Sequence, residues 1–123
     1  MTDIKPLLWI GSARKDYAAF PQDVHDAVGY ALHLAQTGGK HLSAKPLKGF
    51  KGGGVLEVVE DHDGDTYRAV YTVKFEGAVY VLHAFQKKSK KGIETPRQEI
   101  DLIKRRLAIA EADHAERRKE TRQ

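Results

Sequence analysis

Two segments in the middle of the chain alternate between apolar and polar positions with the period of a β-strand. Residues 67–73 carry Arg68, Val70 and Thr72 on one face, and tyrosine, alanine and valine on the other. Residues 79–86 are rich in β-branched and aromatic side chains. Glu76-Gly77 between the two segments is typical of a tight turn. The pattern therefore predicts two neighbouring antiparallel strands.

Two further strands are predicted upstream. Val55–Val59 is a β-rich run, and the Asp63-Gly64 pair that follows it is a hairpin signal. These three central strands form a meander in the predicted fold. Near the N-terminus, Lys5–Ile10 is a short apolar run that ends at Gly11, and we interpret it as a separate strand.

Apolar residues at helical spacing predict three helices. Ser12 can begin a short first helix, which Pro21 interrupts. A second helix runs from residue 22 to the Gly38-Gly39 pair, which suits a helix end. Together these two helices form a hairpin. The third begins at Thr95, with proline next and glutamine three positions on, as in a capping box.

The order of these elements predicts an α+β domain. An N-terminal strand and a helical hairpin are followed by a three-stranded antiparallel meander and a C-terminal helix. The length of 123 residues is that of one domain. We expect residues 1–110 to form this domain. Residues 111–123 are almost entirely charged and form either a solvated extension of the last helix or a frayed tail.

Composition excludes several classes of protein. The chain has no cysteine, so it has neither disulfides nor thiolate metal sites, and a reducing compartment is compatible with it. Apolar runs stay well below the roughly 20 residues of a membrane span, and the N-terminus lacks the apolar core of a secretion signal. We therefore expect a cytoplasmic protein without a membrane partner.

The net charge of +4 conceals a blockwise distribution of charge. Residues 45–56 contain three lysines and no acid, and residues 57–65 contain five acids and no base. Residues 66–91 then contain six bases against one acid. Such blocks suggest basic surfaces for a polyanion, although strand ends and turns in solvent produce the same pattern.

Arg68 lies in the middle of its strand and has two interpretations. Its guanidinium matches phosphate oxygens in a forked geometry, which favours a phosphate ligand. It can equally form a cross-strand ion pair, for which Glu57 is the expected partner. The lysine cluster after the last strand has two interpretations as well, a phosphate-binding surface or a solvated loop. If the strand persists, Lys87 and Lys88 point to opposite faces, and at most one of them shares the face of Arg68.

The sequence contains no complete motif for binding a metal ion or a nucleotide. The six histidines have no spacing that puts two on one helical face. Residues 61–65 resemble the start of a calcium loop, but the glycine falls at the fourth position and the twelfth is Thr72. The glycine run 52–54 precedes a strand and lacks the lysine of a P-loop. We therefore expect no metal site and no cofactor.

The order of five motifs resembles a known family. LKGF at 47–50, VLEVV at 55–59, TYRAVY at 66–71, VYVLHAFQKKSKK at 79–91 and TPRQEI at 95–100 are similar to the phage-derived branch of the HigB/RelE-like toxins. The resemblance spans about residues 5–110, and the F-x-K-K…T-P part is its most specific piece. Val58 and Val59 follow Glu57 where the family often has E-L-R, so one usual arginine is absent.

The resemblance implies a RelE-like microbial RNase fold and a ribosome-dependent messenger RNA endonuclease. It also implies a cognate helix-turn-helix, HigA-like antitoxin and the ribosome as partners. Metal-free RNA cleavage needs a proton acceptor for the 2′-OH, a proton donor for the 5′ oxygen, and cations for the charge that develops on phosphorus. A non-catalytic module that binds RNA or a protein partner on the same fold is the alternative.

Candidate residues follow from these requirements. Arg68 stabilises the developing charge together with Lys87 or Lys88. Glu57 is the first candidate for the general base, and His83 and Tyr71 are alternatives for acid or base. His83 is expected on the face of Val81 and Phe85, where a partly buried core histidine is the competing interpretation. The expected RNA-binding lysines are Lys45, Lys48, Lys51, Lys90 and Lys91.

Overall fold

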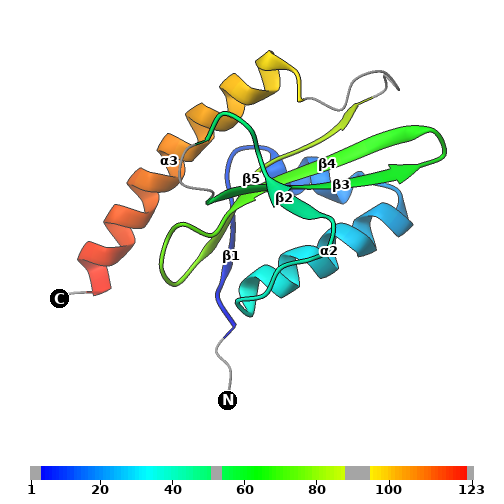
Figure 1. Cartoon of the computed structure of the whole chain (residues 1–123). Helices are drawn as coiled ribbons and strands as arrows, with labels where there is room; N and C mark the ends of the chain where they lie inside the picture. Colours follow the sequence, from blue (N-terminus) through cyan, green and yellow to red (C-terminus); the bar gives the residue numbers. More distant parts are fainter. Residues whose placement is uncertain (1–3, 51–53, 88–94, 122–123) are drawn as a thin grey trace.

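A computed structural model describes residues 4–50, 54–87 and 95–121 of the chain. Its elements, in chain order, are β1 (Leu7–Trp9), α1 (Ala13–Ala18), α2 (Gln22–Gln36), β2 (Ala44–Pro46), β3 (Val55–His62), β4 (Asp65–Thr72), β5 (Val79–Lys87) and α3 (Arg97–Thr121). The strands form one five-stranded sheet in the order β1-β5-β4-β3-β2 (Figure 1). Strand β1 is parallel to β5, and the other pairs are antiparallel. The predicted α+β class is therefore confirmed.

The register of the central hairpin follows from its turn. His62 pairs with Asp65, so the loop has two residues, Asp63 and Gly64. Both have positive φ, at 50° and 83°, as a type I′ turn requires. This turn fixes every pair along β3 and β4, including Glu57 with Val70.

Strand β2 is the element that the sequence did not predict. Three residues, Ala44–Pro46, pair with β3 inside a segment expected to be a loop. A strand of three residues is too short to show alternation, and its proline is tolerated because β2 is at the edge of the sheet. This strand brings Lys45 next to Glu57.

Helices cover both faces of the sheet (Figure 1). On one face, α2 packs through residues such as Val28 and Leu32 against Val58 and Tyr71 of the sheet, and Ala13 of α1 belongs to the same cluster. On the other, Ile103 of α3 packs in a separate cluster with Val70, Tyr80 and Leu82. The central strands β3, β4 and β5 are therefore covered on both sides over most of their length, and Glu57, Arg68 and His83 on the α3 face are buried.

A β-bulge in β5 changes which residues share a face. Val70 pairs with His83 and Tyr71 pairs with Val81, so Leu82 is the extra residue. Val81 belongs to the core beneath α1 and α2, whereas His83 contacts α3. The expectation that His83 shares a face with Val81 is therefore wrong, because the bulge interrupts the alternation. His83 does share its face with Phe85, on which its ring stacks at 4.7 Å between centroids.

Helix α3 continues through residue 110 to Thr121, so the charged segment is helical over its described part. Its second half packs on the sheet. The Tyr80 hydroxyl, which is fully buried, donates a 2.7 Å hydrogen bond to Asp113. Asp113 also accepts a 2.7 Å bond from Arg117, and the ring of His114 contacts that of Phe75. Several residues beyond 110 thus belong to the packed structure.

The Tyr80–Asp113 contact predicts a loss of stability at high pH. Burial, and next the hydrogen bond to Asp113, raise the pKa of Tyr80 from 10.0 to about 12. Because the folded state holds the neutral phenol, this contribution is complete below pH 10 and is lost as pH rises through 12. We expect the wild-type free energy of unfolding to fall by up to about 2 kcal/mol more than that of Tyr80→Phe across this window. Denaturant titrations of both proteins at pH 9 and pH 12 measure the difference, and parallel curves would contradict it.

Candidate active site

A row of side chains crosses the sheet beneath α3. Lys45 pairs with Glu57, Glu57 with Val70, and Val70 with His83. Adjacent strands are about 4.8 Å apart, so Glu57 and His83 stand roughly 10 Å apart on either side of Val70. Val70 lies between them and is fully buried, as is Ile103 of α3 in the same cluster. The row therefore has two polar ends separated by an apolar centre.

At the first end, Glu57 and Arg68 form a buried ion pair. Arg68 Nη1 donates to Glu57 Oε2 at 3.0 Å, and only 4% and 10% of the two side chains are exposed. The Thr95 hydroxyl accepts from Arg68 Nη1 and donates to Glu57 Oε2, both at 3.2 Å. All of these contacts on Glu57 fall on Oε2, and no described residue bonds to Oε1.

Glu57 also lines a cavity of about 260 Å³. Thr95, just before α3, and Ile100 of α3 also line it, together with Lys45, Leu47 and Lys48. Both lysines are exposed, whereas Leu47 is buried and anchors the segment that carries them. The cavity thus combines two cations with a carboxylate of which one oxygen, Oε1, bonds no described residue.

At the second end, His83 lies between an acid and a base from α3. Its Nε2 hydrogen-bonds Glu99 Oε2, and Arg106 Nη1 lies 3.3 Å from its Nδ1. Arginine can only donate, so Nδ1 is the acceptor and the ring proton is on Nε2, pointing to Glu99. Both ring nitrogens of His83 therefore have partners within the protein.

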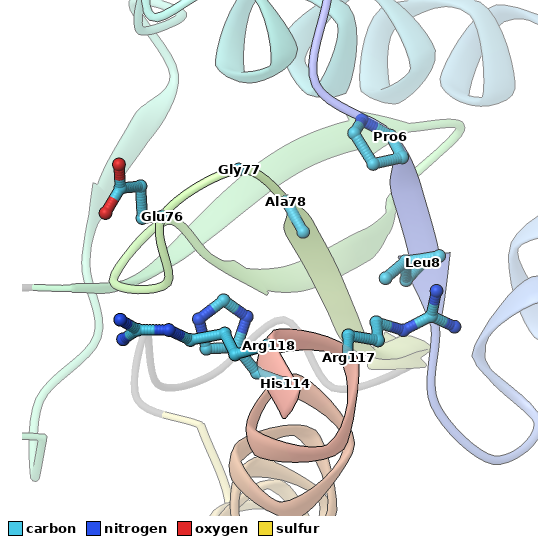
Figure 2. A pocket seen from close by; sticks show the side chains of 8 residues that line it. All are labelled: Pro6, Leu8, Glu76, Gly77, Ala78, His114, Arg117 and Arg118. Atoms are coloured by element: carbon cyan, nitrogen blue, oxygen red, sulfur yellow. The ribbon is translucent and has the colours of Figure 1, made fainter. Parts of the chain in front are cut away.

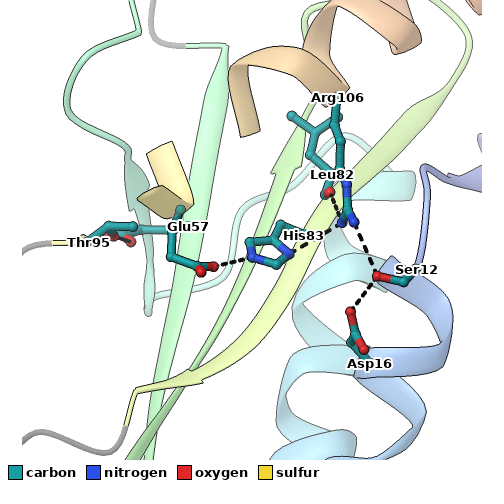
Figure 3. A network of polar contacts seen from close by, with 8 residues as sticks. Ser12, Asp16, Glu57, Leu82, His83, Thr95 and Arg106 are labelled. Carbon is teal, nitrogen blue, oxygen red and sulfur yellow. Dashed lines mark hydrogen bonds and ion pairs between the residues drawn. The ribbon is translucent and has the colours of Figure 1, made fainter. Parts of the chain in front are cut away.

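Arg106 is held in place by further contacts (Figure 3). It donates to the Leu82 carbonyl at 3.0 Å and to Ser12 Oγ at 3.1 Å, and Ser12 in turn donates to Asp16 at 2.7 Å. Gly11 makes room for the guanidinium, since a Cβ there would meet Arg106 Nε at 2.9 Å, and its φ of +58° suits glycine. The helix and the β1–α1 connection thus fix the orientation of His83.

A second cavity, of about 410 Å³, adjoins this network. Among the described residues that line it, Asp16 and Glu99 are acidic and none is lysine or arginine. Phe20, Tyr67 and Phe85 contribute aromatic walls. The two cavities therefore differ in character, one being cationic and the other acidic and aromatic.

The structure brings together some of the predicted residues and separates others. Glu57, Arg68 and His83 share the α3 face, and Lys45 and Lys48 lie at the cavity of Glu57. Tyr71 is fully buried in the core beneath α2, on the opposite face, where burial raises its pKa. No described residue bonds its hydroxyl. The structure thus does not bring Tyr71 to the site.

The remaining lysines are only partly described. Lys87 ends β5 opposite Thr66, one alternate position beyond Phe85, so it is on the face of Arg68. Lys51, Lys88, Lys90 and Lys91 lie outside the described residues.

Sequence reasoning missed three polar residues of the site. Thr95 was expected only to begin a helix, yet its hydroxyl joins the Glu57–Arg68 pair. Glu99 and Arg106 are seven positions apart, with the buried Ile103 between them, so all three are on one helical face. The sequence signal that could have revealed Glu99 and Arg106 is their position as charged residues on the otherwise apolar face of α3.

Another cavity lies at the far end of α3 (Figure 2). It has a volume of about 470 Å³ and is lined by His114, Arg117 and Arg118 of the helix, by Pro6 and Leu8 near the N-terminus, and by the 76–78 turn. Among the residues that the structure describes, the predicted site residues are absent from its lining. It is therefore separate from the row beneath the N-terminal half of α3.

Within residues 4–50, 54–87 and 95–121, three or more histidine, cysteine or acidic residues nowhere converge as metal ligands. Across the same residues, the helices are either too short or too polar to cross a membrane.

Comparison with known proteins identifies the family. A family model described as phage-derived protein Gp49-like (DUF891) matches residues 15–108. The chain therefore belongs to the phage-derived Gp49-like family, which agrees with the phage-derived part of the predicted resemblance. No curated protein matches the chain. One similar solved structure is the toxin–antitoxin complex RelBE2 from Mycobacterium tuberculosis, with 20% identity, a TM-score of 0.45, and coverage of 72% of this chain and 98% of that one.

Proposed function

We propose that this Gp49-like protein is the toxin of a toxin–antitoxin pair. In this proposal it cleaves messenger RNA on the ribosome without a metal ion, and a helix-turn-helix, HigA-like antitoxin neutralises it. The motif order that resembles the HigB/RelE-like toxins supports this function. The cavity at Glu57 supports it independently, because it combines the chemical groups that such a reaction needs.

One observation carries the proposal. Glu57 Oε2 is held by Arg68 and Thr95, while no described residue bonds Oε1 in a cavity that Lys45 and Lys48 line. An anchored carboxylate with one oxygen unoccupied by the described residues suits a general base. Two lysines beside it suit the phosphates that flank a scissile bond.

The proposed reaction uses these groups in turn. Glu57 Oε1 accepts the proton of the ribose 2′-OH, and the 2′ oxygen attacks the adjacent phosphorus. The 5′ oxygen leaves with a proton from the ammonium of Lys45 or Lys48, which gives a 2′,3′-cyclic phosphate and a 5′-OH end. Arg68 keeps Glu57 in position and, with Lys87, stabilises the negative charge that develops on phosphorus. Lys51, Lys88, Lys90 and Lys91 would extend the RNA contact.

A binding module without catalysis is the second candidate. The burial of the Glu57–Arg68 ion pair favours this alternative, because an arginine side chain that is only 4% exposed is typical of a structural ion pair. The toxin requires both RNA at the lysines and cleavage, whereas the module binds RNA or a protein partner and cleaves nothing. Controlled expression in a bacterial host distinguishes them. The toxin arrests growth and produces new ends in translated messages, whereas the binding module permits growth and produces no new ends.

Charge reversal at the cavity tests the role of the lysines. We expect Lys45→Glu/Lys48→Glu to weaken binding of single-stranded RNA and to lower the slope of log K against log salt by about 1.4, at roughly 0.7 for each lost phosphate contact. Fluorescence anisotropy at several salt concentrations measures this slope. Lys40→Glu/Lys119→Glu, which changes the net charge equally away from both cavities, is the matched control. Equal slopes for the two variants would remove Lys45 and Lys48 from the RNA contact.

A further inference from the structure

The 410 Å³ cavity beside His83 has no role in the reaction proposed above. Its volume is within the range of about 300–1,000 Å³ that small-molecule sites occupy. Its described lining contains two carboxylates, Asp16 and Glu99, and neither lysine nor arginine. Groups that donate hydrogen bonds to a carboxylate are the complementary ligands.

The aromatic side chains that line the cavity favour a planar, aromatic ligand. The ring of Phe85 is partly exposed and stacks on His83 at an interplanar angle of 20°. Phe20 and Tyr67, which belong to the core on the opposite face of the sheet, also line the cavity and pack edge to face at 5.1 Å. Planar aromatic ligands stack on such rings, and unpaired RNA bases are recognised by stacking together with hydrogen bonds to their edges.

Glu99 is the residue that can accept hydrogen bonds from the edge of a nucleobase. Its side chain is 29% exposed, and its Oε2 is held by the Nε2–H of His83, whose tautomer Arg106 fixes. No described residue bonds Oε1, and a carboxylate has about four acceptor positions in total. The carboxylate is thus oriented by its neighbours and keeps capacity for a ligand.

We propose that this cavity is a nucleobase subsite that prefers guanine. The N1–H and the 2-amino group of guanine are adjacent donors, which match the two oxygens of Glu99, while the base stacks against Phe85. Uracil and adenine lack this pair of adjacent donors. This inference rests on the proposed function, because it takes RNA as the substrate. It adds a preference for one base to that function. His83 and Arg106 are positioning residues in this subsite.

The test measures binding and is independent of cleavage. Three oligoribonucleotides serve as probes: nine uridines, the same strand with a central guanosine, and the same strand with a central inosine, which keeps N1–H and lacks the 2-amino group. We expect wild type to bind the guanosine strand about 5- to 150-fold more tightly than the uridine strand, as one bidentate contact allows. The inosine strand should fall between them.

Substitutions at the cavity test whether the guanosine preference depends on its side chains. Glu99→Gln should lose most of the guanosine preference, because an amide offers one acceptor where the carboxylate offers two, while Asp101→Asn on the exposed part of α3 should retain it. Phe85→Leu should weaken binding of all three strands. Equal affinities for wild type, undetectable binding, or a guanosine preference that survives Glu99→Gln would each overturn the subsite. Message cleavage by wild type, measured separately, would still leave the proposed function in place.

Discussion

Arg68→Ala should destabilise the protein by about 3–5 kcal/mol. The substitution leaves the Glu57 carboxylate, which is 10% exposed, without its guanidinium partner beneath α3. Removing one member of a buried ion pair has this cost because the remaining carboxylate loses its charged partner and, at 10% exposure, is only poorly solvated. A domain of this size has a total stability of about 5–15 kcal/mol, so the loss is a large fraction of it. Loss of activity in Arg68→Ala would therefore not establish a catalytic role.

A double substitution separates folding from function. Glu57→Leu/Arg68→Met removes both charges and fills the space with apolar side chains, which is often neutral or stabilising. Thr95 is partly exposed, so its hydroxyl can bond water instead. We expect the double variant to unfold within about 1 kcal/mol of wild type, measured by denaturant titration. A double variant as unstable as Arg68→Ala would show that the pair is required for the fold.

The same double variant should lose at least about 10²- to 10³-fold of the cleavage rate, as expected when a group that stabilises the transition state is removed. It removes the proposed general base together with the cation that holds it. The comparison is informative because the variant is expected to remain folded. The readout is the rate at which purified protein cleaves a message on translating ribosomes.

Tyr80→Phe is the matched control for that loss of rate. It alters a buried hydrogen bond at the other end of α3 and should cleave at the wild-type rate. Wild-type activity in the double variant would leave Glu57 and Arg68 with a structural role alone, and catalysis would have to come from other residues.

Strands β3, β4 and β5 and the two longer helices were predictable because each has enough residues to show its period. Alternation indicated β4 and β5, and the Asp63-Gly64 turn implied a two-residue loop. That loop determines the register of β3 and β4, and hence the proximity of Glu57 and Arg68. The ion pair was therefore one of two interpretations that the sequence supported. Strand β2 was not predictable, since its three residues carry no periodic signal.

The environment of His83 could not be predicted from local patterns. A single extra residue, Leu82, reverses the alternation of β5 and turns His83 towards α3. Its partners Glu99 and Arg106 come from a helix that begins more than ten residues later. Bulges leave little trace in a sequence without glycine at the position, and tertiary contacts between distant elements leave none.

The most direct test of the proposed function is a map of 5′ ends on messages translated by purified ribosomes, with and without the wild-type protein. The proposal predicts new 5′-OH ends inside translated regions, absent without ribosomes and absent with folded Glu57→Leu/Arg68→Met. Intact messages in the presence of folded, RNA-binding wild-type protein would contradict the endonuclease and favour the binding module.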